Sequence, residues 1–393
     1  MIHTVRKGDT LESIAQLYLY QTIRAEDIYN KNNLTSRILY IGQTLKIPEL
    51  DEPARSNPDF SGAGLMINGQ EILAVPEIKV KKAFDAIAGT FDFSLPNEPI
   101  YRDICKPYSF YPVDIFHKND LVISGPLLNS SPDLNRVDLS GLGTPGILST
   151  QNIPPNVQRQ WYNTNLKNIA NKYCDLFSIV VVIDDNAKDL ANLKFIKTSI
   201  GPDEFVSTFL SSLARQRGLI ITSTPEGALR ISKDVISASE PVLNLVSPSG
   251  FKTNFDSNAM FSDYIAVRSG NSKRSAAMAK LKNDIDVFRC NVIEQRERVG
   301  ESISEYLQSE MIRGWLSAFM ISGSLPYVRD ANGKLFDCYD IITIEAPEFY
   351  INKPTDFIIR TIDFNFKVNS DTCDLGLIPA EWYFGSFLKF WEK

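Results

Sequence analysis

The first fifty residues alternate between strand-like and helix-like hydrophobic patterns. Apolar positions predict a strand at residues 2–5, and Thr10 can cap a helix over residues 11–18, where apolar side chains recur at helical spacing. A second helix is predicted over residues 25–32 and a last strand over residues 44–47. The pattern therefore predicts a strand-helix-helix-strand module that has little hydrophobic core of its own.

A polar segment over residues 51–63, with two prolines, predicts a linker. The hydrophobic pattern then changes to short strands over residues 64–150. Asn68-Gly69 is a strong hairpin signal, and residues 91–95 alternate strictly between apolar and polar side chains. Many short strands separated by turns predict a small β-barrel, with a loop from residue 141 to 158.

The segment 151–245 mixes both patterns. Apolar residues at three- and four-residue spacing predict a helix over residues 161–177. A second amphipathic helix is predicted over residues 203–217, with Phe205 inward and Gly218 as its C-terminal cap. A hairpin around residues 225–227 completes what we expect to be a compact α+β domain.

Strands return in the last segment, residues 246–393, around one helix that Ser302 and Glu305 begin as a capping box. The basic stretch 273–282 is predicted to be a mobile loop. The aromatic residues near the C-terminus are either buried core or an anchor for a partner. The predicted strands cover residues 264–268, 286–292, 341–345, 357–368 and 373–378.

Composition and charge narrow the class of protein. Of the 393 residues 44% are hydrophobic, which is ordinary for a globular protein, and the net charge is −6 with both signs mixed along the chain. A dedicated nucleic-acid-binding protein usually shows a strongly basic face, so this class is disfavoured. The five cysteines lack metal-ligand spacing, and we expect buried free thiols rather than disulfides: Cys105, Cys174, Cys290, Cys338 and Cys373.

The chain offers little catalytic chemistry. Its only histidines are His3 and His117, which leaves few zinc sites or histidine-based triads, and no nucleotide-binding or hydrolase motif occurs. Asp184-Asp185 resembles a turn. The near-helical series Glu294, Glu297, Glu301 and Glu305 reads as a solvated helix face. No catalytic residue, metal site or cofactor is predicted, although sequence alone does not exclude a glycosidase pair of carboxylates.

No apolar run approaches the length that spans a bilayer. The predicted first strand starts almost at residue 1, which leaves no room for a signal peptide. We therefore expect synthesis and folding in the cytoplasm, without secretion or a membrane segment.

The run His3-Thr-Val-Arg-Lys-Gly-Asp-Thr-Leu-Glu-Ser-Ile-Ala, followed by Asn32-Asn33-Leu34 and Gly42-Gln43-Thr44-Leu45-Lys46-Ile47-Pro48, resembles a LysM module. The resemblance implies a shallow groove for N-acetylated sugars of peptidoglycan or chitin. The groove would be formed by Gly8, Asp9, Thr10, Leu11, Ile38, Leu39, Tyr40 and Ile41. The alternative is that the same Gly-Asp-Thr turn only caps the first helix and that the module docks on other proteins.

Residues 64–385 resemble the baseplate-hub family of contractile phage tails, typified by the Mu-like tail protein, and more distantly the spike base of type VI secretion. The resemblance rests on the order of several weak matches along the chain. They are Leu121-Val-Ile-Ser-Gly, the helix Leu166 to Phe177, Leu213-Ala-Arg-Gln-Arg-Gly-Leu219, Thr224-Pro-Glu-Gly227, Phe261-Ser-Asp-Tyr264 and the closing strands from Phe357 to Ala380. Val137-Asp-Leu-Ser-Gly-Leu-Gly matches the family's glycine-rich segment poorly.

The resemblance implies a β-rich α+β chain: a LysM domain (1–50), a linker (51–63), two tube-like β-barrel domains (64–150 and 246–393) and an α+β middle domain (151–245). It implies a homotrimeric ring in the virion baseplate that joins the sixfold tail tube to the threefold spike. Its partners would be the tail tube protein, the central spike protein and other baseplate proteins, with possible peptidoglycan contact. DNA would pass through the channel without specific binding during genome ejection, because phosphate binding needs basic residues.

A second hypothesis remains: a peptidoglycan-degrading enzyme that the LysM module targets to the wall. The scarcity of histidine, the lack of a catalytic motif and the lack of an export signal favour the structural hub.

Overall fold

The structure is a computed structural model. It describes residues 2–5, 9–11, 13–15, 25–32, 34, 39–40, 42–47, 62–72, 75–102, 104–233, 240–268, 277–283, 285–295, 303–368, 370–383 and 389–391.

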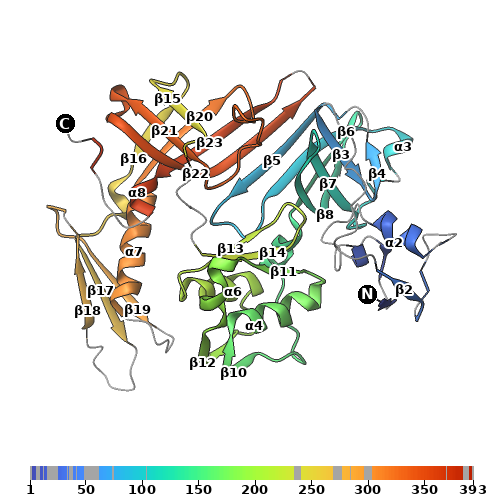
Figure 1. Ribbon diagram of the computed structural model, residues 1–393, viewed down its shortest axis with the longest axis horizontal. Helices are drawn as coiled ribbons and strands as arrows, with labels where there is room; N and C mark the ends of the chain where they lie inside the picture. Colours follow the sequence, from blue (N-terminus) through green and yellow to red (C-terminus); the bar gives the residue numbers. More distant parts are fainter. Residues whose placement is uncertain are drawn as a thin grey trace.

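The molecule is elongated, and its large sheet runs along one side (Figure 1). Two curled sets of strands lie side by side along the top, and three smaller modules hang beneath them. The predicted class, a β-rich α+β chain with an N-terminal strand-helix-helix-strand module, is confirmed. The domain boundaries given above stay a prediction, and the linker segment 51–61 lies outside the described residues.

The N-terminal module pairs β1 (Ile2–Thr4) with β2 (Thr44–Lys46) in an antiparallel ladder. Residues 11 and 13–15 are helical, and α2 (Ala25–Lys31) is the second helix. Its small core is separate from those of the rest of the chain: Val5, Leu11, Ile14, Ala15, Ala25, Ile28, Leu45 and Ile47. The module therefore folds around its own short apolar stripe, as its sequence pattern predicts.

The first strand set follows. Asn68 and Gly69 take left-handed backbone conformations, with φ of 51° and 75°, and turn the chain between β3 and β4 as the hairpin signal predicts. The strands are β3 (Ala63–Ile67), β4 (Gln70–Ile72), β5 (Glu77–Ala83), β6 (Thr90–Pro96), β7 (Pro112–His117), β8 (Asp120–Pro132) and β9 (Arg136–Leu142), with the short helices α3 (Pro99–Arg102) and η2 (Thr144–Ser149) between and after them.

The middle module packs helices α4 and α6 against each other and beside a three-stranded sheet, β11-β14-β13. The side chains of Ile169, Tyr173, Phe209 and Leu213 fill its core. Its elements are β10 (Gln160–Asn165), α4 (Leu166–Cys174), η3 (Asp175–Phe177), β11 (Val181–Ile183), η4 (Asp185–Ala187), α5 (Lys188–Asn192), β12 (Lys194–Ser199), α6 (Val206–Arg215), β13 (Ile220–Ser223) and β14 (Leu229–Ser232).

The second strand set contains β15 (Leu243–Val246), β16 (Lys252–Phe255), β20 (Phe319–Leu325), β21 (Ile341–Ala346), β22 (Ile351–Lys367) and β23 (Thr372–Pro379). The short helices η5 (Ser257–Ala259), η6 (Pro347–Phe349) and α8 (Ala380–Tyr383) accompany it. A module with its own sheet hangs from this set and shares its hydrophobic cluster (Figure 1). It consists of the sheet β18-β17-β19 and the helix α7 (Ile303–Ala318) that packs on it, where the strands are β17 (Asp263–Arg268), β18 (Ala277–Lys282) and β19 (Cys290–Gln295).

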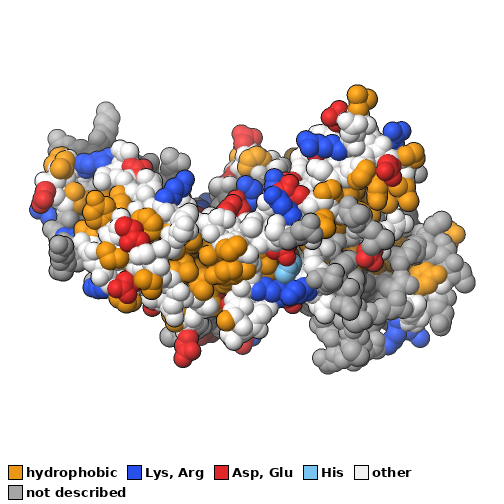
Figure 2. All heavy atoms as spheres, turned by 90° about the horizontal axis from the view of Figure 1, so that it is seen from above, with side chains coloured by type: hydrophobic (Ala, Val, Ile, Leu, Met, Phe, Trp, Pro, Cys, Tyr) orange, Lys and Arg blue, Asp and Glu red, His pale blue; other side chains and the backbone are white. Residues whose placement is uncertain are grey.

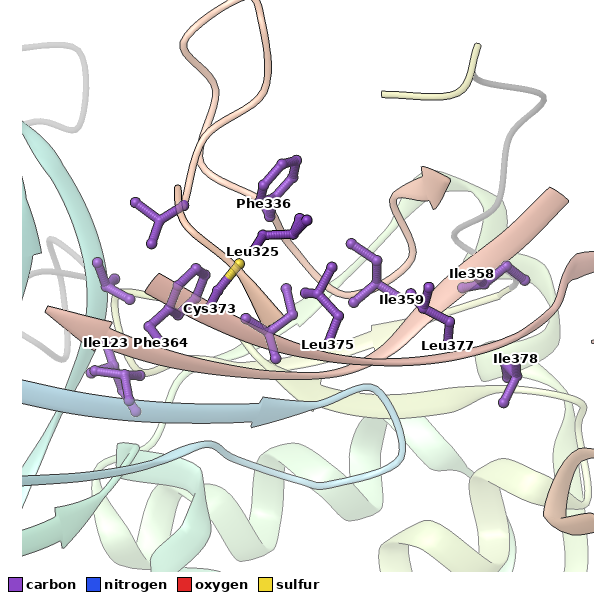
Figure 3. Close-up of a cluster of buried hydrophobic side chains, with 14 of the residues drawn as sticks. Ile123, Leu325, Phe336, Ile358, Ile359, Phe364, Cys373, Leu375, Leu377 and Ile378 are labelled. Atoms are coloured by element: carbon purple, nitrogen blue, oxygen red, sulfur yellow. The ribbon is translucent and has the colours of Figure 1, made fainter. Parts of the chain in front are cut away.

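One sheet runs through both strand sets. Its hydrogen-bonded order is β16-β20-β23-β22-β5-β6-β9-β8-β7-β3-β4, and the antiparallel pairing of β22 with β5 joins the two sets over seven registered residue pairs. Their buried residues form one hydrophobic cluster. Figure 3 shows part of it, with Leu375 and Leu377 standing on β23 and with Phe336 and Leu325 near them. The two sets are therefore one continuous folded unit.

The structure corrects several predicted elements. Residues 161–165 belong to strand β10, because Asn165 accepts a hydrogen bond from the Asn168 N–H (2.9 Å) and so starts the helix only at Leu166. Phe205 precedes α6 and is 43% exposed rather than inward. Residues 277–282 of the predicted basic loop form β18, since their period-two pattern suits a strand that pairs with β17.

Three smaller corrections concern boundaries and exposure. The predicted loop at 141–158 begins later, because β9 extends to Leu142, and it contains the helix η2. The strand predicted from residue 286 starts at Cys290. Cys290 is exposed and Cys338 is half-buried rather than buried, although all five cysteines are free thiols as expected.

Candidate functional site

The first candidate site is a polar face on the continuous sheet. Residues opposite each other on neighbouring strands point to the same side, and so do residues two positions apart on one strand. The registers connect Asp374 to Asp363, Asp363 to Lys81, and Lys79 to Asp92. Extended across eight strands, the polar sheet face consists of Asn129, Ser131, Arg136, Asp138, Ser140, Thr90, Asp92, Ser94, Glu77, Lys79, Lys81, Thr361, Asp363, Asn365, Lys367, Thr372, Asp374, Ser322, Ser324, Lys252 and Asn254.

The alternating residues on the same strands point into the core. Val80 on β5, Phe91 on β6 and Leu139 on β9 are almost wholly buried, as are Phe364 on β22 and Leu375 on β23. The burial patterns of β5, β6 and β9 alternate with a period of two. This half-buried sheet therefore keeps one face in the core and presents the polar face to its surroundings.

Four of the five cations on the polar sheet face, all except Lys252, form ion pairs among the described residues. Lys81 Nζ lies 3.1 Å from a carboxylate oxygen of Asp363, and Arg136 Nε lies 3.2 Å from Asp138. Lys79 and Lys367 both approach Glu77, at 3.8 and 3.4 Å. Each pair is exposed and adds little stability, but it neutralises a cation that would otherwise attract phosphate.

Burial raises the pKa of Asp92, while Lys79 and Lys81 nearby act in the opposite direction. The mixing of signs extends beyond this face. In the view of Figure 2, acidic and basic side chains are interspersed among apolar ones, and neither sign forms a continuous patch.

His117 connects the two strand sets. It lies at the end of β7, is 2% exposed, and stacks on Phe366 of β22 with ring centroids 5.0 Å apart. Arg329 donates from Nε to His117 Nδ1 (3.0 Å), so the Nε2–H of the neutral ring donates to Asp371 (3.0 Å). Arg329 also donates to Asp120 (2.7 Å) and to the His117 carbonyl (2.6 Å).

Protonation of His117 is expected to weaken this connection. Burial, more than any other cause, lowers the pKa of His117; Arg329 and Lys118 act in the same direction, and Asp371 opposes them. Because an unfolded histidine titrates near pH ~6.5, the unfolded chain takes up the proton first as the pH falls below that value. We expect the melting temperature to be insensitive to this group above about pH 6.5 and to fall below it.

The matched control is His117→Gln, which keeps hydrogen-bonding capacity at the site but does not titrate. Thermal unfolding followed at pH 7.5 and 5.5 compares the two proteins. An equal loss of melting temperature in both would contradict the assignment to His117.

The predicted LysM groove is only partly described. Gly8, Ile38 and Ile41 lie outside the described residues. Thr10 and Ser13 form reciprocal hydrogen bonds at the start of the first helix. The Ser13 N–H donates to Thr10 Oγ1 (3.1 Å), and the Thr10 N–H donates to Ser13 Oγ (2.9 Å). The helix-capping role of the turn is thus present, and sugar binding in this groove stays a prediction.

The remaining groove residues differ in their surroundings. Asp9 contacts His3 (2.7 Å), while Leu11 is 1% exposed and belongs to the module's core. Leu39 packs against that core. Tyr40 is 71% exposed, so among the described groove residues it is the large side chain that is placed to meet a ligand.

The acidic residues considered in the sequence as catalytic or metal-binding candidates do not come together in one site among the described residues. Asp184 accepts hydrogen bonds from Arg230 Nε (2.9 and 3.1 Å), and Asp185 pairs with Lys188 (2.5 Å). Glu297 and Glu301 lie outside the described residues, as do the side chains of Glu294 and Glu305. Across the part of the chain that the structure describes, no group of histidine, cysteine and acidic residues is arranged to hold a metal ion. Nor does any helix there combine the length and the apolarity needed to cross a bilayer.

Two segments match known protein families. Residues 3–48 match the LysM domain, and residues 154–233 match the second domain of baseplate hub protein gp44-like proteins. The chain therefore carries a LysM domain and a baseplate-hub domain. The residues of the baseplate-hub domain form the middle module, which contains helices α4 and α6 and the sheet β11-β14-β13. The resemblance stated from the sequence is confirmed, and no curated protein sequence matches the chain.

Solved structures share the fold around the baseplate-hub domain. The 43 kDa tail protein of prophage MuSo2 from Shewanella oneidensis is 18% identical and superposes with a TM-score of 0.69 over 82% of this chain and 99% of that one. The tail protein from Neisseria meningitidis MC58 is 16% identical, with a TM-score of 0.68 over 83% and 99%. Prophage tail protein gp18 from Listeria monocytogenes EGD-e is 10% identical, with a TM-score of 0.54 over 80% and 94%.

The polar sheet face was not predicted from the sequence. A signal for it was present, because Lys79 and Lys81, Asp92 and Ser94, and Asp138 and Ser140 alternate with apolar residues. What the sequence lacked was the register that places these strands side by side.

Proposed function

We propose that the chain is a structural hub of a contractile phage tail baseplate, or of a related injection system. Three copies would form a ring that joins the tail tube to the central spike. The observation that carries this proposal is the continuous sheet, which joins two strand sets and has one polar, charge-paired face. The baseplate-hub domain and the tail-protein fold support it.

The ends of this sheet favour ring closure. Strand β16 pairs with β20 on one side, and no strand pairs with its other side among the described residues. Near the other end of the sheet, which terminates in β4, β7 pairs only with the earlier half of β8. The later half of β8 pairs with β9 and has no second strand beside it among the described residues. Open strand edges invite pairing with another chain, and a closed ring satisfies them without uncontrolled association. In our proposal β16 of one protomer pairs with β8 of the next.

The polar sheet face would then line the channel. Four of its five cations lie beside carboxylates, as Lys81 does beside Asp363. Phosphate contacts need available cations, so a charge-paired wall lets DNA pass without retaining it. The protein would act in the virion by symmetry matching and conduction, without catalysis.

The LysM domain would serve at the periphery of this ring. It would dock on neighbouring baseplate proteins or contact peptidoglycan during penetration. The tail tube protein and the spike protein would bind the two rims of the ring.

Ring closure is tested by removing one backbone N–H of β16 that points away from β20 and is free to pair with another protomer. The Asp256 N–H bonds to the Ala318 carbonyl, so by alternation along the antiparallel pair the N–H of Thr253 points away from β20. Thr253→Pro removes this donor and no bond of the existing ladder. We expect the trimer to be lost while the protomer stays folded, as measured by mass photometry and circular dichroism.

The control is Thr253→Val, which keeps the N–H and should assemble like the unaltered chain. A trimer that persists in Thr253→Pro would contradict pairing through β16. A chain that stays monomeric when mixed with its tube and spike proteins would contradict the hub.

A further inference from the structure

A second candidate site is a cavity of about 790 Å³ where the LysM module, the first strand set and the middle module meet. Its volume is within the range of about 300–1,000 Å³ typical of small-molecule sites. The described lining residues are Thr10, Ser13, Asn68, Gly69, Gln70, Ser109, Phe110, Tyr111, Pro112, Ser124, Gly125, Pro126, Thr144, Ile147, Phe177 and Ser178.

Two hydroxyl groups in this lining are buried without a hydrogen-bond partner. Ser124 on β8 is 2% exposed, and neither its Oγ nor that of Ser109 has a partner among the described residues. A buried hydroxyl without a partner is costly, so such groups usually meet a bound molecule or water. The two hydroxyls therefore indicate a ligand that offers hydrogen-bonding groups on this side of the cavity.

The rest of the lining restricts the class of ligand. None of the described lining residues is charged, and a buried ion would lack a counter-charge there. A purely apolar ligand would leave the Ser109 and Ser124 hydroxyls unsatisfied. The ligand must therefore be neutral and rich in hydroxyl or amide groups.

Aromatic side chains complete the site. Phe110, Tyr111 and Phe177 line the cavity, and Phe110 is 57% exposed. Phe110 also has a left-handed backbone conformation, with φ of 51°, which is strained for a residue with a bulky side chain. Strain of this kind concentrates at ligand sites, where it holds a side chain in position. A flat aromatic ring beside hydroxyl and amide groups suits the apolar face of a sugar ring.

We propose that this cavity binds a neutral saccharide. The Ser109 and Ser124 hydroxyls would bond the sugar's hydroxyl or acetamido groups, and Phe110 would pack against a ring face. The site shares Thr10 with the groove expected around Tyr40, but most of its lining comes from the strand set and the middle module. It goes beyond the hub function and does not depend on ring formation.

Isothermal titration calorimetry on the full chain tests the proposal, with tetrasaccharides of N-acetylglucosamine and of glucose as probes. We expect at least one of them to bind. Phe110→Ala and Ser124→Val should each weaken that binding by about tenfold, through loss of ring packing and of a hydrogen bond. Phe110 is half exposed, so its replacement leaves the fold intact even if Ser124→Val does not.

The matched control is Leu134→Ala, which truncates a 90% exposed apolar residue of the same strand set outside the cavity and should bind normally. Tyr40→Ala reports on the predicted LysM groove. The proposal is overturned if neither sugar binds, if affinity is unchanged in Phe110→Ala, or if only Tyr40→Ala abolishes binding. The ring is measured separately through Thr253→Pro, so each proposal can fail alone.

Discussion

Replacing Trp382 by alanine is expected to lower the free energy of unfolding by about 3–5 kcal/mol, the range for truncating a large buried aromatic residue. Trp382 is 2% exposed and packs against Trp315, Phe319 and Phe390, with ring centroids 5.0 to 5.8 Å apart. Such a substitution removes aromatic contacts and leaves a cavity that the surrounding sheet cannot fill. Guanidinium unfolding followed by tryptophan fluorescence measures the change.

This result decides between the two interpretations of the aromatic C-terminus. Trp391 is only partly buried at the edge of the same cluster and provides the control, since Trp391→Ala should cost less. If Trp382→Ala leaves stability unchanged but blocks association with other baseplate proteins, the tail is an anchor. The burial of Trp382 and Phe390 favours core.

A basic channel wall is expected to slow DNA release by at least about tenfold at low salt, because each added cation that contacts a phosphate makes binding stronger and salt-dependent. The double substitution Asp138→Lys and Asp374→Lys exchanges anions for cations on the polar sheet face. Asp374 is opposite Asp363, so a lysine there also relieves like-charge repulsion. DNA release from particles that carry the variant is measured with a DNA-binding dye at 50 and 500 mM salt.

The effect should be strong at 50 mM salt and largely disappear at 500 mM, because salt screens phosphate contacts. The matched control is Asp175→Lys with Asp189→Lys, which makes the same change of charge on the surface of the middle module. Equal slowing in both variants would show that net charge, and not the polar sheet face, controls release. Normal release at 50 mM salt would contradict the proposed channel.

Much of the fold could be predicted from local pattern. Asn68-Gly69 specifies a tight hairpin, and the helices at Leu166 and Val206 follow apolar spacing that any amphipathic helix shows. The sequence pattern failed where two signals compete. Trp161 and Tyr162 fit the helical spacing, but aromatic residues also favour strands, and the capping side chain of Asn165 decided the boundary.

The polar sheet face and the cavity could not be predicted in the same way. Both depend on residues far apart in the chain: Asp363 meets Lys81 across the two strand sets, and Ser124 faces the same cavity as Thr10 and Phe177. Local propensity carries no information on such pairings, since register and module packing decide them. The LysM domain, in contrast, could be predicted from its motif, because the residues that define it lie within one short segment of the chain.

The ladder between β22 and β5 has a consequence for how a ring would be built. The two strand sets of one subunit would form two neighbouring segments of the ring wall, and the β22–β5 ladder already joins them within one polypeptide. Half of the contacts between segments of a threefold ring would therefore form as each subunit folds, and their formation would not depend on protein concentration. Only the other half must be made by encounters between subunits. A dilute pool of newly made chains could then close a complete collar with fewer bimolecular steps than six separate segments would need.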